Sequence, residues 1–388
     1  MANGPHALVK AIAQGYLLDT DAGARLSNTR LVPIQKGNNS IRPIQVGEVL
    51  LNTARGVLAR SCGKKLTLKF PKYILGCGTS GAVETGIEAV RMALAPKHTG
   101  RICITVDCKN AYNTVFRSAV QAGLEKHCPE LLPIYWTAYQ GTTKAFYNTG
   151  YGVSDRTEFI SVEEGVMQGD NLGPIIFQTA IVDILMVVHT RFGDVMVISY
   201  LDDISLTGDI EPCFGAFQEL SQRLLEVGLH VNPDKCSLYC PSGLNSGITM
   251  KRTRTDESEE EEEEEAIFTV PDLAARFGFK DVNVSERGIT ILGAPIGSDD
   301  YVTTALQQTY NDIFTTCNNL LAAMRASVDP SIFHGLFKIL QLCASAKAIF
   351  WLRNVPPTQT GEFASQVDDL ITDTMYGLLN QPRPWTKP

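Results

Sequence analysis

The spacing of apolar and polar residues predicts a chain of short strands and helices with no internal repeat. Alternating apolar residues over 31–46, around a Gly-Asn turn, predict two paired strands. Apolar residues recur every three or four positions in 81–95, which predicts a helix. The same reasoning predicts strands at 101–107, 229–239 (a pair) and 287–297, a hairpin at 197–208, and helices at 47–61, around 115–124, and at 172–192, 213–228 and 301–352.

Three aspartates fall at the ends of these predicted strands. Asp107 closes the strand at 101–107, and Asp202 and Asp203 form the tip of the hairpin "VISYLDDISLTG". An acidic pair in a turn is ordinarily structural, because Asp bonds its own backbone there. If the hairpin pairs with the first strand in one antiparallel sheet, however, the three carboxylates meet and repel each other unless cations neutralise them. Hard oxygen ligands favour Mg²⁺ or Mn²⁺, and two such ions suit phosphoryl transfer.

Bulk composition indicates a globular chain of two or three subdomains, with 44% apolar and 20% charged residues. The N-terminus does not resemble a signal peptide, and we expect no membrane-spanning run. We therefore expect a soluble, intracellular chain, nuclear or cytoplasmic, that does not bind membranes. The ten cysteines include no CxxC pair, and the cluster of Cys236, Cys240 and His230 lacks two further ligands for zinc. Buried free thiols in a reducing compartment are the better interpretation.

A dense acidic run dominates the net charge. The formal charge is −8, but nine acidic residues lie within 256–265, and the rest of the chain sums to +1. A block of like charge repels itself and stays solvated, so we expect a disordered loop at 251–266. The body of the chain can then carry basic patches for nucleic acid.

Five segments occur in the order of the palm motifs of reverse transcriptases, most closely those of non-LTR, LINE-like retrotransposons: "ITVDCKNAYNTV", "GVMQGDNLGPIIF", "SYLDDISL", "GLHVNPDKCSLY" and "ITILGAPIG". Upstream, "LVPIQKGNNSIRPIQVGEVL" and "GCGTSGAVETGIEAVRMAL" resemble the fingers, so the resemblance covers about 25–358. It implies an α+β right-hand polymerase fold. The N-terminal segment and fingers would occupy 1–95, the palm 96–298 with a fingers insertion at about 130–165, and a helical thumb-like part 299–388.

The resemblance also implies roles for individual residues. Asp107, Asp202 and Asp203 would hold two Mg²⁺ or Mn²⁺ ions, and Lys235 would protonate the leaving pyrophosphate. The expected dNTP-binding residues are Lys36 and Arg42 at the triphosphate, Tyr112 against the sugar, and Gln168 and Gly169 along the nucleotide. The implied partners are an RNA template, a DNA primer or template–primer duplex, and dNTPs, and the oligomeric state is left open. The implied activity is RNA-directed DNA synthesis, a nucleotidyltransferase reaction.

Two features depart from the family pattern. Asn171 replaces the usual proline in "QGDNLGP", a change that could loosen the turn before the following helix. The acidic run is also foreign to the family. We expect a tolerated insertion, although an acidic tract could instead mimic nucleic acid in the template groove.

Two other functions stay open at this stage. "GCGTSG" matches GxGxxG and precedes a helix, as in dinucleotide-binding folds. The preceding segment contains Pro71, however, which argues against a central strand. A domesticated, inactive reverse transcriptase that binds RNA or protein is the second alternative. The intact carboxylates at 107, 202 and 203 favour activity.

Overall fold

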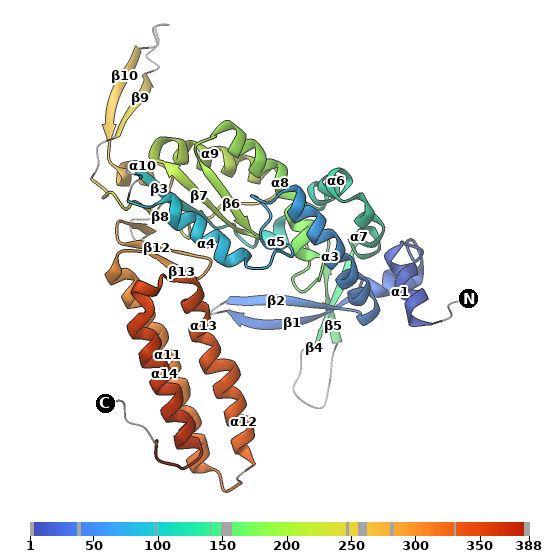
Figure 1. Ribbon diagram of the computed structural model, residues 1–388. Coiled ribbons are helices and arrows are strands. Elements are labelled where there is room, and N and C mark those ends of the chain that lie inside the picture. Colours follow the sequence, from blue (N-terminus) through green and yellow to red (C-terminus); the bar gives the residue numbers. More distant parts are fainter. Residues whose placement is uncertain are drawn as a thin grey trace.

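The computed structural model describes residues 4–36, 40–96, 98, 100–139, 141–148, 157–245, 248–254, 262–279, 283–329 and 331–383. Helices and strands of these ranges combine into two larger sheets, two hairpins and a helical bundle (Figure 1). In chain order the elements are α1 (Pro5–Ala13), α2 (Asp21–Leu26), β1 (Thr29–Lys36), β2 (Ser40–Gly47), α3 (Val49–Lys69), α4 (Ala82–Ala93), β3 (Arg101–Val106), α5 (Ala111–Thr114), α6 (Arg117–His127), η1 (Pro129–Leu131), α7 (Leu132–Tyr139), β4 (Thr143–Asn148), β5 (Thr157–Val162), α8 (Gly173–Arg191), β6 (Met196–Tyr200), β7 (Asp203–Asp209), α9 (Ile210–Glu226), β8 (Ser237–Tyr239), β9 (Ile248–Arg254), β10 (Glu262–Phe268), α10 (Val270–Arg276), β11 (Val284–Ser285), β12 (Gly288–Ile291), β13 (Ala294–Gly297), α11 (Asp299–Ala326), α12 (Ile332–Ile339), η3 (Leu340–Ala344), α13 (Ser345–Asn354) and α14 (Pro357–Leu378).

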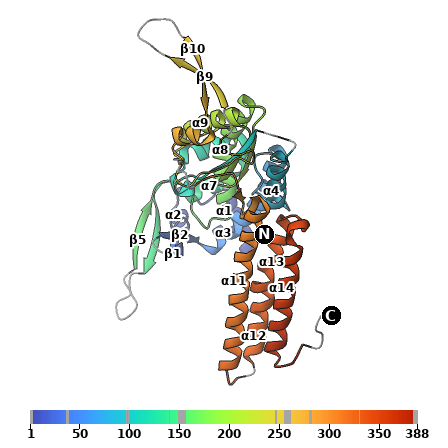
Figure 2. The same ribbon diagram turned by 90° about the vertical axis from the view of Figure 1, so that its left-hand side faces the viewer.

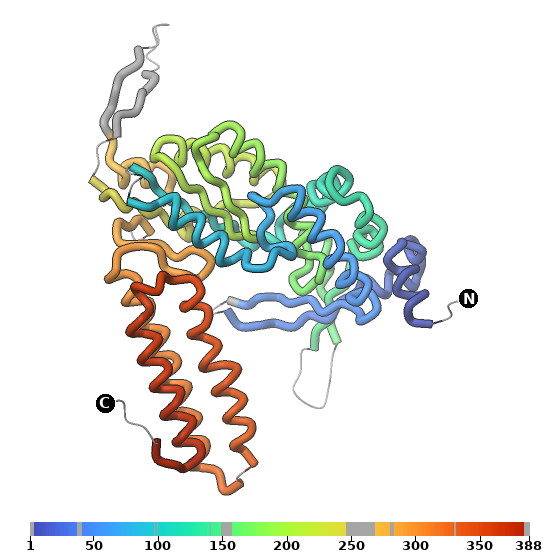
Figure 3. The backbone as a smooth tube through the Cα atoms, viewed as in Figure 1, coloured from blue at the N-terminus to red at the C-terminus, as the bar shows by residue number. Residues whose placement is uncertain are grey.

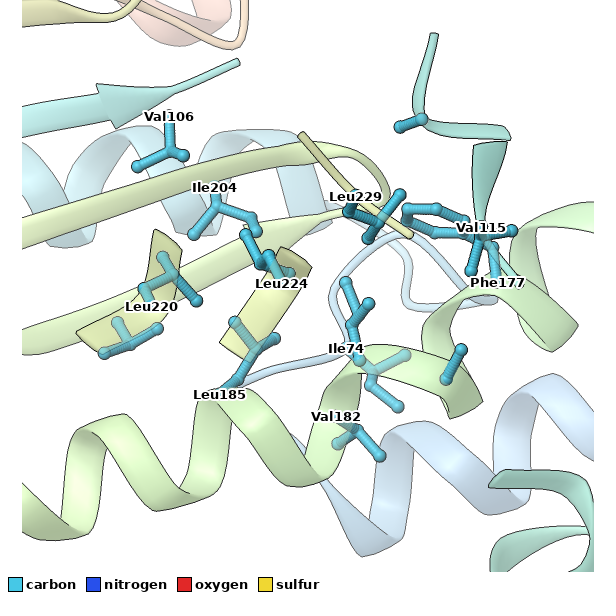
Figure 4. Close-up of a cluster of buried hydrophobic side chains, with 14 of the residues drawn as sticks. Ile74, Val106, Val115, Phe177, Val182, Leu185, Ile204, Leu220, Leu224 and Leu229 are labelled. Carbon is cyan, nitrogen blue, oxygen red and sulfur yellow. The ribbon is translucent and has the colours of Figure 1, made fainter. Parts of the chain in front are cut away.

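The palm sheet, our name for the five strands in the order β11-β8-β3-β7-β6, is antiparallel except for the β11–β8 pair. Helices α8 and α9 pack on one of its faces, over apolar side chains such as Val106 and Ile204 (Figure 4). The other face meets α4 and the β12–β13 hairpin around Cys103 and Ile198. Because side chains alternate along a strand, both faces of the sheet contribute to a core.

The fingers sheet, our name for the strands in the order β2-β1-β4-β5, joins two distant parts of the chain. β1 and β2 form the predicted antiparallel pair, although residues 37–39 of its turn lie outside the described residues. β1 then pairs in parallel with β4, where Thr29 lies opposite Ala145. Figure 3 shows these blue and green segments together.

The C-terminal bundle, formed by α11 to α14 with the π-helical turn η3, has its own apolar core around Ile313, Leu340 and Phe363. It extends away from the palm sheet in both views (Figures 1 and 2). α11 begins directly after β13, and Arg91 of α4 donates to the carbonyl of Asn354 at the end of α13. The α+β prediction and the helical character of 301–352 are therefore confirmed.

Several predicted elements need correction. The helix expected around 115–124 is present as α6, which begins two residues later, at Arg117. The single strand expected at 287–297 is instead a hairpin, because Leu292 and Gly293 adopt left-handed conformations that turn the chain. The strand pair expected at 229–239 is only β8 and a single bridge between Cys108 and Val231. Pro233 lacks an N–H, and Lys235 closes a turn onto the carbonyl of Asn232 (2.9 Å).

The disordered acidic loop expected at 251–266 overlaps two strands of the described residues. β9 and β10 pair there, in a register that sets Glu264 opposite Arg252 and Glu265 opposite Lys251. Residues 255–261, which carry the remainder of the run before β10, lie outside the described residues.

Two stretches of the described residues are long and apolar enough to cross a membrane by length and composition, which we had not expected. The first is α8, and 61% of its apolar window is buried inside the protein, as befits a core helix. The second, Ile332–Asn354, forms one wall of the C-terminal bundle through α12, η3 and α13.

Candidate active site

The register of the palm sheet brings the predicted carboxylates to the same end of neighbouring strands. Val106 of β3 lies opposite Ile204 of β7, so Asp107 and Asp203 each come one residue beyond this pair. Tyr200 lies opposite Asp203, which leaves Leu201 and Asp202 as the two-residue turn of the β6–β7 hairpin. Alternation places Asp107 and Asp203 on the face opposite α8 and α9, together with Thr105 and Ser205.

A cleft of about 370 Å³ opens on this face. Asp107, Asp203 and Lys235 line it. Val83 of α4 and residues 290–293 of the β12–β13 hairpin line it as well. Carboxylates, a lysine and a hairpin turn thus share one cleft at the end of the palm sheet.

The electrostatics of the cleft disfavour three bare carboxylates. Desolvation raises the pKa of Asp107, and Asp202 raises it further, whereas Lys235 and Lys36 lower it. Desolvation likewise raises the pKa of Asp203, with Asp202 and Asp107 adding to the shift and Lys36 opposing it. The buried Oδ2 of Asp107 has no hydrogen-bond partner among the described residues. A cation would relieve both the repulsion and the unmet acceptor.

The carboxylates do not form a closed metal cage. Across the described ranges, no three His, Cys, Asp or Glu side chains are grouped closely enough to hold an ion. Mg²⁺ usually binds through one or two carboxylates together with waters and substrate phosphates, so an open arrangement still fits it. Among the described residues, Cys236, Cys240 and His230 belong to no group of three or more side chains that could hold a metal ion.

Lys235 is fixed to the strand end that carries Asp107. The carbonyl of Asp107 accepts from the backbone N–H of Asn232 (2.8 Å), and its own N–H donates to Sγ of Cys236 (3.5 Å). Lys109 donates in the same way to the carbonyl of His230 (2.8 Å). The loop before β8 is thereby held alongside residues 107–109, which places Lys235 in the cleft.

The two predicted basic residues lie on the β1–β2 ribbon. Lys36 ends β1, and Arg42 lies opposite Ile34 on β2. Facing residues share one side of a sheet, so Lys36 and Arg42 project to the same side. Lys36 lowers the pKa values of Asp107 and Asp203, which indicates that this side of the ribbon faces the cleft.

Tyr112 lies on α5, next to the carboxylate end of β3. Its ring stacks on Phe177 of α8, with centroids 4.7 Å apart and planes 14° apart. Desolvation raises its pKa above the usual range for tyrosine, and Asp202 adds to the shift. The ring therefore combines a packed position with proximity to the carboxylates.

Gln168 and Gly169 dock onto the fingers sheet. The carbonyl of Gln168 accepts from the backbone N–H of Gln45 in β2 (2.7 Å). Gly169 has φ +110°, and a Cβ there would lie 2.7 Å from the carbonyl oxygen of Gln45, so this position requires glycine. The buried Oε1 of Gln168 has no partner within the part of the chain that the structure describes.

The structure gives the glycine motif "GCGTSG" a packing role. Leu201 in the hairpin turn has φ +62°, a costly conformation for a leucine, and its side chain lies against Gly76. A Cβ on Gly76 would come 2.7 Å from Cδ2 of Leu201. Gln178 and Ser199 donate to the carbonyl of Leu201 (2.6 and 3.0 Å). Because residues 66–69 belong to α3, no strand precedes the motif and the dinucleotide alternative fails.

Sequence reasoning missed two parts of this site. The β12–β13 turn lines the cleft, and the pair of alternating runs around Leu292-Gly293 could have indicated a hairpin. The contact between Gly76 and Leu201 had no sequence signal, because it joins residues far apart in the chain.

Comparisons with known proteins agree with this arrangement. A family model described as "Reverse transcriptase (RNA-dependent DNA polymerase)" matches residues 34–296. The retrotransposable element SLACS 132 kDa protein of Trypanosoma brucei gambiense is 26% identical over 240 residues, which are 60% of this chain and 19% of that protein. The chain thus spans about a fifth of this curated relative.

Two telomerase structures are also similar. Apo telomerase from Candida tropicalis, truncated from its C-terminal domain, is 14% identical with a TM-score of 0.42, over 60% of this chain and 55% of that one. Telomerase from Candida albicans, in complex with a TWJ fragment of telomeric RNA, is 13% identical with a TM-score of 0.42. That match covers 97% of this chain and 65% of the other.

Proposed function

Because the chain belongs to the reverse transcriptase (RNA-dependent DNA polymerase) family, we propose that it is the polymerase domain of a non-LTR retrotransposon protein and extends a primer with dNTPs on an RNA template. One observation carries the proposal: Asp107, Asp203 and Lys235 line a single cleft, and Asp202 precedes Asp203 in the β6–β7 turn. These are the residue types that nucleotidyl transfer needs at one place.

Each residue has a part in the proposed reaction. Asp107, Asp202 and Asp203 would hold two Mg²⁺ or Mn²⁺ ions, which when bound supply charge neutralisation at the attacking and leaving oxygens. Lys36 and Arg42 bind the triphosphate of the dNTP, with Arg42 as a two-pronged donor. Lys235 gives a proton to the departing pyrophosphate.

Other groups position the substrates. The ring of Tyr112 packs against the deoxyribose, where a 2′-hydroxyl would collide with it, and Gln168 with Gly169 lies along the nucleotide. The β12–β13 turn lines the same cleft, and the primer end would rest against it. Catalysis then comes from orientation and charge stabilisation, with little covalent chemistry by the protein. Template–primer duplex binds through phosphate contacts, and its affinity falls as salt rises.

The test is primer extension on an RNA template with dNTPs or NTPs, comparing wild type with Asp202→Asn. We expect dNTP incorporation by wild type, at least about 10³-fold less by the variant, and none by either protein with EDTA. Equal incorporation by the two proteins would refute the catalytic assignment, and use of NTPs alone would refute the role of Tyr112. If wild type binds duplex but is as inactive as Asp202→Asn, the chain is instead a nucleic-acid-binding relative.

A further inference from the structure

A buried ion pair lies directly behind Gln168 and Gly169. Asp170, the next residue, has a fully buried side chain, and that of Arg55 on α3 is 2% exposed. Arg55 Nε lies 3.5 Å from Asp170 Oδ1. By contrast, Lys65 on the same helix forms an ion pair with Glu130 of η1 that is well exposed to solvent.

Tyr139 of α7 completes this cluster. Its hydroxyl donates to Asp170 Oδ2 (2.5 Å) and accepts from the backbone N–H of Met167 (3.3 Å). Burial raises the pKa of Tyr139 well above its ordinary value, so the group stays a hydroxyl donor. The other oxygen of Asp170 accepts from the N–H of Leu172 (2.9 Å). Asp170 therefore fixes the backbone on both sides of itself.

Three separate elements hold this short loop. Arg55 reaches it from α3, Tyr139 from α7, and Gln45 of β2 through the carbonyl of Gln168. Asn171 adds a bond from its Nδ2 to the carbonyl of Asn52 on α3 (3.1 Å). Asn171, which we expected to loosen the turn, thus links the turn to α3.

Stability alone does not explain a buried charge pair here. Apolar residues of similar volume are often as stable in such a position or more so. Arg55 also keeps two buried nitrogens, Nε and Nη2, without a hydrogen-bond acceptor among the described residues, which is costly. The charges supply orientation instead. The carboxylate of Asp170 is held by three neighbours, Arg55, Tyr139 and the N–H of Leu172, and so allows the loop one position.

We propose that Asp170, held by Arg55 and Tyr139, is a positioning residue that fixes Gln168 and Gly169 for the incoming nucleotide. This inference rests on the proposed function. Because Asp170 acts through its neighbours and not on the reacting atoms, its loss weakens use of the dNTP and leaves binding of the template–primer duplex unchanged.

The test compares Tyr139→Phe, Asp170→Asn and the double variant Arg55→Met/Asp170→Leu with wild type. Measurements are kcat, KM for dNTP, duplex Kd and Tm. Tyr139→Phe removes one hydroxyl, and the double variant removes both charges, so neither leaves an unpaired buried ion. We expect a rise of roughly 10- to 100-fold in KM for dNTP in all three, with duplex Kd unchanged and the Tm of the double variant close to wild type.

Lys65→Gln on the exposed face of α3 serves as the matched control and should leave KM unchanged. A folded double variant or Tyr139→Phe variant whose KM stays within twofold of wild type would overturn the inference while leaving the polymerase assignment intact. An inactive wild type would instead overturn the proposed function, and this inference with it.

Discussion

Two charged regions of the site are built differently. We call the end of the palm sheet with Asp107, Asp202, Asp203 and Lys235 the floor, and the β1–β2 pair with Lys36 and Arg42 the ribbon. Asp107 and Asp203 lie at the end of strands that have hydrogen-bonded neighbours on both sides, and the turn between β6 and β7 is tied down by Gln178 and Ser199. Lys36 and Arg42 lie on a two-stranded ribbon at the edge of the fingers sheet and are exposed to solvent.

This difference separates two ways of using charge. Groups that must coordinate or transfer a proton need a fixed place, and the palm sheet supplies it through backbone bonds. Groups that attract a polyanion act over several ångström, and long side chains on a ribbon are sufficient. The floor should therefore tolerate almost no change of side-chain length, and the ribbon should tolerate it well.

The largest expected difference comes from substitutions that change the length of a side chain and keep its charge. Asp202→Glu should lower kcat by about 10²-fold or more, because the added methylene moves the carboxylate by more than an ångström. Lys36→Arg should change activity by less than about twofold, since the field of the cation is kept. Both are measured by steady-state primer extension. Asp209→Glu, at the far end of β7, is the control. A loss of less than about tenfold in Asp202→Glu would contradict the proposed difference between the floor and the ribbon.

Lys235 belongs to the fixed floor although it is a long side chain. Lys235→Met should lower kcat by about 10²-fold and flatten the alkaline limb of the pH–rate profile, because the proposed proton donor to pyrophosphate is lost. The pH dependence of single-turnover extension checks this. Lys126→Met, an exposed lysine paired with Asp183, is the control. A reduced rate with an unaltered pH profile would show that Lys235 acts only as a charge.

On the ribbon we expect a graded effect. Arg42→Gln should raise KM for dNTP about tenfold and leave kcat little changed, because one charge-assisted contact to the triphosphate is lost. Arg30→Gln is a matched control, since Arg30 lies on the same side of β1 but six residues from Lys36. Equal KM values for the two variants would remove Arg42 from the nucleotide site.

The smallest effect concerns stability. The raised pKa of Asp107 means that the folded state holds its proton more tightly than the unfolded state, so stability falls as pH rises from about 4 through the raised value. At neutral pH without divalent ions, Asp107→Asn should therefore stabilise the chain, by about 0.5–2 kcal/mol. Thermal melts in EDTA should show the gain at pH 7 and none below about pH 4. A gain that persists at low pH would contradict the titration of Asp107.

Sequence reasoning identified the strands of the palm sheet that carry the aspartates, because their signals are local. Short apolar, β-rich runs marked the strand that ends at Asp107 and the hairpin at Asp202, and the family motifs indicated the order of the other segments. It failed where partners are distant: periodicity shows which side of β1 is apolar, but not that β4 lies beside it. It also missed Arg55 and Asp170, because a buried ion pair appears in sequence as two ordinary polar residues.

The parallel pairing of β1 with β4 affects how the chain folds during its synthesis. Thr29 leaves the ribosome 116 residues before Ala145, its partner in the fingers sheet. At roughly 5–20 residues per second, the first ribbon waits several seconds or more for its neighbour. Until β4 is synthesised, the backbone of β1 that later pairs with it stays unpaired. An unpaired strand edge can associate with other chains, so we expect chaperones to act on this segment.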